Sequence, residues 1–143
     1  MLHRDFLIRQ IQQAVQVLML ALARVLKLKD EERYEQAIEE VKLIFGELDF
    51  SPRPVGELTA QELVDLCTTP QGFQVELALS IADLLREEGD ALRHLERNAL
   101  ACASEAKALA LYKTALRMEG AAMPLDIQTR MSSLEENLRT HCQ

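Results

Sequence analysis

The residues best suited to chemistry in this chain are three histidines and three cysteines. His3 and His141 lie near the two ends of the sequence, and His94 lies inside a helical segment. A carboxylate metal site on a helix needs a glutamate three positions before its histidine, but those positions hold Ala91 and Leu138. No cysteine pair has the spacing of a zinc site. We therefore expect no metal and no cofactor, and we expect His94 to be exposed or at an interface.

The cysteines predict little chemistry either. Cys67, Cys102 and Cys142 are far apart and odd in number, which does not indicate a disulfide framework and suits a reducing cytoplasm. Cys67 and Cys102 lie in apolar segments, where cysteine usually packs as a small hydrophobic residue. Cys67 or Cys102 could still form a nucleophilic pair with His94. However, the chain lacks the glycine-rich loops that usually shape a catalytic cleft.

The carboxylate clusters favour solvated helix surfaces over acid–base catalysis. Asp30, Glu31 and Glu32 lie at the start of a predicted helix, where negative charge is favoured by the helix dipole. Glu87 and Glu88 come at the predicted end of another helix, where the same rule disfavours them. No phosphate-binding glycine loop occurs. We predict no catalytic residues and a protein that is not an enzyme.

Charge is distributed unevenly along the 143 residues, whose net charge is −7. An acidic chain has no general attraction for phosphate backbones, so we expect no nucleic-acid partner. Residues 1–29 nevertheless carry five bases against one acid, and residues 30–66 carry eleven acids against three bases. The basic segment either opposes the acidic one within the fold or attracts an anionic membrane or an acidic partner.

Apolar periodicity and the positions of proline and glycine predict an all-α, single-domain bundle or array of about six helices over residues 1–143, with no β-sheet. Ser51 to Glu57 is irregular and a candidate hinge, and Thr59 with Glu62 reads as a capping box. Pro70 is placed at the start of the fourth helix, which we expect to be central, and Gly89 at its end. The predicted helices span 4–28, 31–48, 60–68, 71–88 and 125–140, with 90–119 forming either one helix or two that turn near Ser104.

The first helix carries the strongest functional indication. Its apolar residues recur at alternating steps of three and four, as along a heptad seam, and the stretch from Val17 to Ala23 is apolar all the way round. Such a helix needs cover on every side. We therefore expect it to lie deep in the structure and to pair with a second copy, forming a homodimer. The expected interface residues are Ile8, Ile11, Val15, Val17, Leu18, Leu20, Leu22 and Val25.

Two alternatives remain for this helix. In the first, it is the central helix of a monomeric bundle, covered by the second and last helices. In the second, its bases hold it on an anionic membrane as a peripheral helix. A membrane-spanning role is disfavoured, because only 14 residues separate Arg9 from Arg24 and four of those are glutamine.

Several segments resemble known families. The segments Tyr34–Val41 and Ala108–Leu116 are similar to the second helix of a tetratricopeptide hairpin, in which small residues let helices approach. The opening Asp5–Ile11 and the segment Leu77–Leu85 resemble an uncharacterised family of short all-helical bacterial proteins. That resemblance implies a bacterial, cytoplasmic protein with tetratricopeptide-like hairpins and assigns no catalytic residue. Together these observations predict a helical interaction or scaffold module whose protein partner is unknown.

Overall fold

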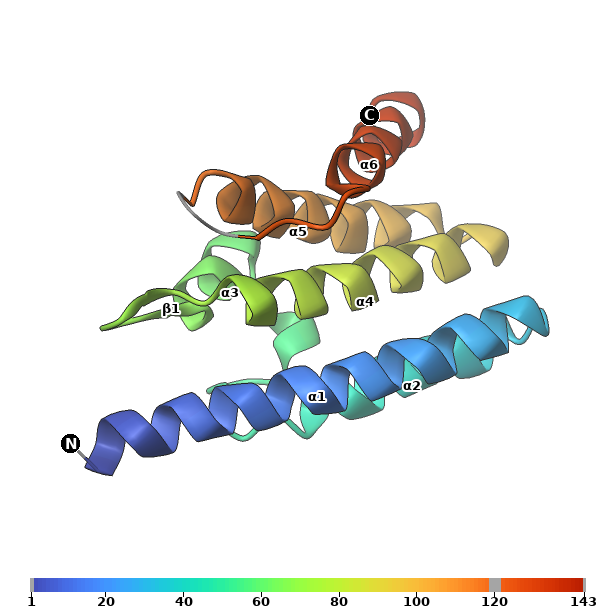
Figure 1. Ribbon diagram of the computed structural model, residues 1–143. Coiled ribbons are helices and arrows are strands. Elements are labelled where there is room, and N and C mark those ends of the chain that lie inside the picture. The colour runs from blue at the N-terminus through green and yellow to red at the C-terminus, as the bar shows by residue number, and fades with distance from the viewer. Residues whose placement is uncertain (1, 119–121, 143) are drawn as a thin grey trace.

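A computed structural model describes residues 2–118 and 122–142, with side chains from Phe6 onward (Figure 1). It is all-α apart from one very small sheet. The elements are α1 (Leu2–Asp30), α2 (Tyr34–Gly46), the short 3₁₀ helix η1 (Val55–Glu57), α3 (Ala60–Leu66), β1 (Thr68–Thr69), β2 (Gly72–Phe73), α4 (Val75–His94), α5 (Asn98–Leu116) and α6 (Ile127–His141).

The helices lie in three layers. The antiparallel pair α1 and α2 forms one layer, α4 and α5 form the next, and α6 crosses the far side of α5 (Figure 1). Helix α4 packs against α1, α2 and α5, which confirms the prediction that it is central. Its apolar residues Leu77, Ile81 and Leu84 are fully buried. The main core therefore lies between the α1–α2 layer and the α4–α5 layer.

Two hairpin turns of the same conformation build these layers. At the end of α1, Glu32 has a φ of 60°, and the N–H of Arg33 donates to the carbonyl of Leu28 at 2.8 Å. At the end of α4, Glu96 has a φ of 59°, and an equivalent bond of 2.9 Å closes the turn. This is the Schellman arrangement, which normally uses glycine at the left-handed position. The link between the first two helices thus makes a tight antiparallel hairpin.

The break between α4 and α5 differs from the prediction. Helix α4 continues through Gly89 to His94, and α5 begins at Asn98, so residues 90–118 form neither one helix nor two that turn near Ser104, and residue 119 lies outside the described residues. Gly89 is buried, and a Cβ atom there would lie 2.7 Å from the Cγ of Glu105. Glycine at this position serves the close approach of α4 and α5 rather than a helix end.

Two further predictions are wrong between α3 and α4. Pro70 lies in the turn of a β-hairpin, where Thr69 pairs with Gly72 and Thr68 with Phe73, so a small sheet exists. The Thr69 hydroxyl accepts the N–H of Gln71 at 3.2 Å, and Gly72 has a φ of 115°. These interactions hold the chain in a turn and delay the start of α4 to Val75.

The structure of the segment before α3 agrees better with what the sequence predicts. The predicted capping box is confirmed: the N–H of Glu62 donates to the Thr59 hydroxyl at 3.1 Å, and the N–H of Thr59 donates to the Glu62 carboxylate at 2.9 Å. Within the candidate hinge 51–57, Val55 is fully buried and the Gly56 carbonyl accepts a bond of 3.0 Å from Lys107. The irregular segment is therefore anchored to the core and to α5.

Candidate functional site

Helix α1 presents one face to the core and one to solvent. Of the eight residues predicted at an interface, Ile11, Leu18 and Val25 belong to the chain's own core. Val15 and Leu22 are half-buried at the edge of that core. These five residues are thus covered, wholly or in part, within a single chain.

The buried seam of α1 includes two alanines that the prediction missed. Ala14 is 6% exposed and Ala21 is fully buried, so the seam runs through residues 11, 14, 18, 21 and 25. Alanine contributes little to an apolar pattern, but its small side chain lets the backbone of a packed helix come close. The spacing by three and four was correct, whereas its register around the helix was shifted.

The opposite side of α1 is exposed. Leu20 is 63% exposed, Met19 61% and Val17 38%, and Ala23 beside them is also exposed. We call Val17, Met19, Leu20 and Ala23 the outer band. Ile8, the last of the predicted interface residues, is also exposed, but it lies more than two turns before the band.

These exposures correct two expectations. Helix α1 forms an outer edge of the chain rather than its centre, because it packs against α2 and α4 only on one side. The alternative in which the second and last helices cover it is wrong as well. Helix α6 lies across α5, on the far side of the α4–α5 layer (Figure 1).

Bases surround the outer band along α1. Arg9 and Lys27 are exposed, and Arg24 binds Glu40 of α2 through a 2.6 Å ion pair. The Arg24 pair fits the expectation that the basic first helix opposes the acidic second one. By length and composition, the stretch Phe6–Asp30 is also apolar enough to cross a membrane, despite its glutamines.

Helix α4 carries a row of charged groups that sequence reasoning interpreted incorrectly. Glu87 and Glu88 lie inside the helix and are buried, not at a solvated end. Glu87 binds Lys29 at the end of α1, and Lys29 also binds Asp90 at 2.6 Å. Burial lowers the pKa of Lys29, but the hydrogen bonds that its ammonium donates to Asp90 and Glu87, with the charges of these carboxylates, outweigh burial and leave this pKa raised.

Glu88 faces α5 rather than α1. Its carboxylate accepts a 2.7 Å hydrogen bond from the Ser104 hydroxyl. Burial raises the pKa of Glu88, and this effect exceeds the opposing influence of Ser104, Lys42 and Lys107. A buried carboxyl with a raised pKa is a familiar feature of acid–base sites, but here the hydroxyl partner makes it part of the α4–α5 contact.

A second buried carboxyl ties α4 to α5 and α6. Asp83 accepts a hydrogen bond from the hydroxyl of the buried Tyr112 and a 2.9 Å bond from Arg130. Burial raises the pKa of Asp83, against the lowering effects of Tyr112 and Arg130. Burial also raises the pKa of Tyr112, with Asp83 adding to the shift. This cluster fixes α6 against the α4–α5 layer.

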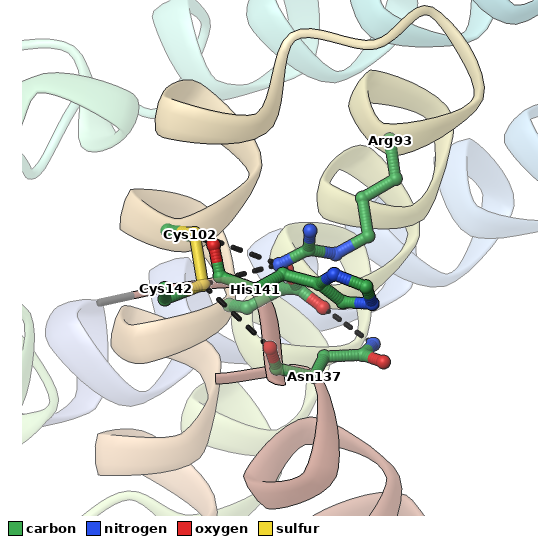
Figure 2. Close-up of a disulfide and its surroundings, with 6 residues drawn as sticks. Arg93, Cys102, Asn137, His141 and Cys142 are labelled. Carbon is green, nitrogen blue, oxygen red and sulfur yellow. Dashed lines mark hydrogen bonds and ion pairs between the residues drawn. A yellow bond between two sulfur atoms is a disulfide. The ribbon is translucent and has the colours of Figure 1, made fainter. Parts of the chain in front are cut away.

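The cysteines are arranged differently from the prediction. Cys102 of α5 and Cys142, which follows α6, form a disulfide, so the chain holds one cross-link after all (Figure 2). The 40-residue separation gave no sign that the two residues meet. Cys67 behaves as expected: it is fully buried, and burial raises its pKa to about 12. Of the two cysteines considered as nucleophiles, Cys102 is therefore held in the disulfide, and Cys67 is a free but buried thiol that ionises with difficulty.

An arginine lies against the disulfide. The guanidinium of Arg93 reaches from α4 to the sulfurs, with Nη2 at 3.2 Å from Cys142 Sγ and 3.6 Å from Cys102 Sγ (Figure 2). The same group forms an ion pair with the buried Glu105, which accepts a 2.7 Å bond from Asn137. The sequence offered no signal for this cluster, because its members come from three separate helices.

His94 is placed at the surface where α4 meets α2. Its ring stacks on Tyr34, with ring centroids 4.3 Å apart and planes 4° apart, and its Nε2 lies 3.6 Å from the Asp90 carboxylate. Among the residues with described side chains, no group of three His, Cys, Asp or Glu side chains could hold a metal ion.

Comparison with known proteins adds no relative: no family model, no curated protein and no solved structure matches this chain.

Proposed function

We propose that the protein is a helical interaction module that pairs with a second copy of itself through the outer band of α1. The observation that supports this proposal is the exposure of Met19 and Leu20, each more than 60%, next to Val17 and Ala23. Scattered exposed apolar residues are normal, but a contiguous group of them marks an interaction surface. Pairing would remove four apolar side chains per copy from water.

The shape of the band suits a second helix. Its members fall within two turns on the outer side of α1, and small Ala23 would allow a facing helix to approach closely. Glutamines and bases, including Gln16 and Lys27, surround it and would form the polar rim that interfaces commonly have. A band this short predicts a weak dimer that dissociates on dilution. Any other protein partner would compete for the same surface.

Sedimentation velocity with matched variants tests this proposal. We expect Leu20→Glu to shift the protein to monomer with unchanged helicity, because this side chain makes little contact within its own chain. The control is Leu100→Glu on α5, a leucine of similar exposure at 59% on another helix. Equal self-association of wild type and Leu20→Glu would overturn the proposal, as would equal weakening by both substitutions.

A second candidate function is peripheral membrane binding by α1. The exposed bases Arg9 and Lys27 and the exposed apolar side chains of the outer band support it. A basic amphipathic helix binds anionic lipid by electrostatic attraction and apolar insertion. Flotation with vesicles of phosphatidylcholine alone and with added phosphatidylserine separates the two candidates. Binding that needs the anionic lipid and weakens with salt would favour the membrane, and its absence at low salt would dismiss it.

A cytoplasmic location, a bacterial source and tetratricopeptide-like hairpins remain proposals. The cytoplasmic proposal loses part of its original support, because two of the three cysteines are joined in a disulfide. The paired hairpins with matching turns at Glu32 and Glu96 are compatible with repeat-like stacking. We assign no reaction to the protein.

A further inference from the structure

The disulfide between Cys102 and Cys142 lies in an environment unlike that of a buried structural cross-link. Both residues are half-buried near the end of α6, and the neighbouring His141 is exposed. The third cysteine, Cys67, is fully buried in the core. The pair is therefore closer to solvent, and to a reductant dissolved in it, than Cys67 is.

The charge placed beside this disulfide is positive. Arg93 Nη2 lies within hydrogen-bonding distance of Cys142 Sγ, at 3.2 Å (Figure 2). A guanidinium next to a cysteine stabilises the thiolate and lowers the thiol pKa. The arginine is fixed in place, since its partner Glu105 is only 1% exposed and is held in turn by Asn137.

We propose that Cys102–Cys142 is a site of thiol–disulfide exchange with a thiol reductant, and that Arg93 stabilises the thiolate that leaves. In the first step, a reductant thiolate attacks Cys102 Sγ and the S–S bond breaks. The electron pair of that bond leaves on Cys142 Sγ, beside Arg93. A second reductant thiolate then attacks the reductant's sulfur in the mixed disulfide, which releases Cys102 as a thiol after protonation. The protein disulfide is reduced to two thiols, and two reductant thiols are oxidised to one disulfide.

The other charged groups near the disulfide determine how far Arg93 is expected to lower the pKa of the Cys142 thiol. Arg93 faces the sulfurs from α4, Glu105 binds Arg93 from α5, and α6 supplies the exposed His141, whose carbonyl oxygen lies 3.8 Å from Cys102 Sγ. In the oxidised protein, the carboxylate of Glu105 neutralises the positive charge of Arg93. After reduction, Cys142 shares that guanidinium with Glu105, so we expect a moderate rather than extreme lowering of its pKa.

Alkylation kinetics of the reduced, folded protein test the proposal. The rate of iodoacetamide modification is followed from pH 5 to 10, with mass spectrometry to locate the alkylated residue. Cys67 serves as an internal check on folding, because it should stay unmodified. We expect the Cys142 thiol pKa to lie about one unit below the ordinary value of about 8.5, which gives roughly tenfold more thiolate at pH 6.5. A Cys142 pKa at or above about 8.5 would overturn the proposal.

Variants separate the charge of Arg93 from its packing. The double variant Arg93→Gln/Glu105→Gln removes both partners without leaving a buried unpaired charge, and Arg93→Lys keeps the charge. We expect the double variant to lose the lowered pKa and to be opened several-fold more slowly by reduced glutathione at pH 7, because the departing Cys142 thiolate is no longer stabilised. Arg93→Lys should retain part of the effect, and the control Arg97→Gln all of it. An unchanged pKa in the double variant would overturn the role of Arg93.

Discussion

At the scale of single residues, close packing of α4 on α5 depends on one glycine. Gly89 lies inside α4, where alanine would ordinarily improve helix stability by about 1 kcal/mol. The added Cβ would meet the Cγ of Glu105, a buried side chain that Arg93 and Asn137 hold in place. The steric clash with Glu105 therefore destabilises the folded protein, whereas the higher helix propensity of alanine stabilises it. We expect the clash to be the larger of the two effects.

We accordingly expect Gly89→Ala to lower the free energy of unfolding by about 1–3 kcal/mol. Urea denaturation followed by circular dichroism measures the change. Gly46 at the end of α2 is the matched control, because a Cβ there meets nothing within 4 Å. Stabilisation by Gly89→Ala, similar to that of Gly46→Ala, would contradict the close approach of α4 and α5.

The buried carboxyl of Glu88 predicts a pH dependence. Burial raises its pKa, so the ionised form is disfavoured in the folded state relative to the unfolded one. Stability should therefore fall as the pH rises from below the ordinary glutamate pKa towards neutrality. The Glu88→Gln variant keeps an acceptor for Ser104 but cannot ionise.

We expect Glu88→Gln to be more stable than wild type at pH 7, with the difference shrinking towards pH 4. Denaturation at a series of pH values measures it, with Glu39→Gln on the exposed face of α2 as control. A difference that is the same at pH 4 and pH 7 would show that ionisation of Glu88 is not its cause.

At the scale of secondary-structure elements, the two hairpin turns use a residue that fits them poorly. Glu32 and Glu96 both occupy the left-handed position of a Schellman turn, where a non-glycine residue is strained. Glycine removes that strain but adds flexibility to the unfolded chain. We expect the relief of backbone strain in the folded state to exceed the added entropy of the unfolded chain, so glycine should be the more stable residue at both positions.

We expect Glu32→Gly and Glu96→Gly each to raise stability by about 0.5–1 kcal/mol. The control is Glu31→Gly, one residue earlier and without a positive φ, which should lower stability by a similar amount. Thermal unfolding of the three variants measures the effect. A loss of stability at both left-handed positions would contradict this description of the turns.

The disulfide joins α5 to the end of α6 across 40 residues. Cross-linking chiefly restricts the unfolded chain, so its loss should cost about 2–4 kcal/mol of stability. We expect Cys142→Ser to show this loss under oxidising conditions and to equal wild type under reducing ones. Equal stability of the two proteins when oxidised would indicate that the bond does not form in solution.

The sequence predicted the order and type of the helices well and their ends less well. Thr59 and Glu62 mark the start of α3 through a local interaction, which is readable from spacing alone. Gly89 misled the prediction, since the same residue serves a helix end or a close helix contact. The end of α4 at His94 was missed, because the left-handed residue of the following turn is Glu96 and not a glycine.

The candidate sites were harder to predict for a similar reason. The position of Arg93 against Cys102 and Cys142 depends on how three helices pack, and no local spacing encodes that. On α1, spacing by three and four identified an apolar seam, but Ala14 and Ala21 determine which side of the helix is buried.

At the scale of the whole molecule, the three-layer arrangement leaves α1 with one uncovered side. Helix α4 already occupies the centre, and α6 crosses the opposite layer (Figure 1). The outer band of α1 is thus left exposed in the single chain, and we propose that a second copy buries it.

Sedimentation equilibrium of the unmodified protein over a concentration series tests this claim most directly. We expect the weight-average mass to rise with concentration from the 16.2 kDa of one chain towards twice that value. The rise should be well under way at about 100 μM, and it should be absent for Leu20→Glu. A wild-type mass that stays at 16.2 kDa up to several hundred micromolar would contradict the account.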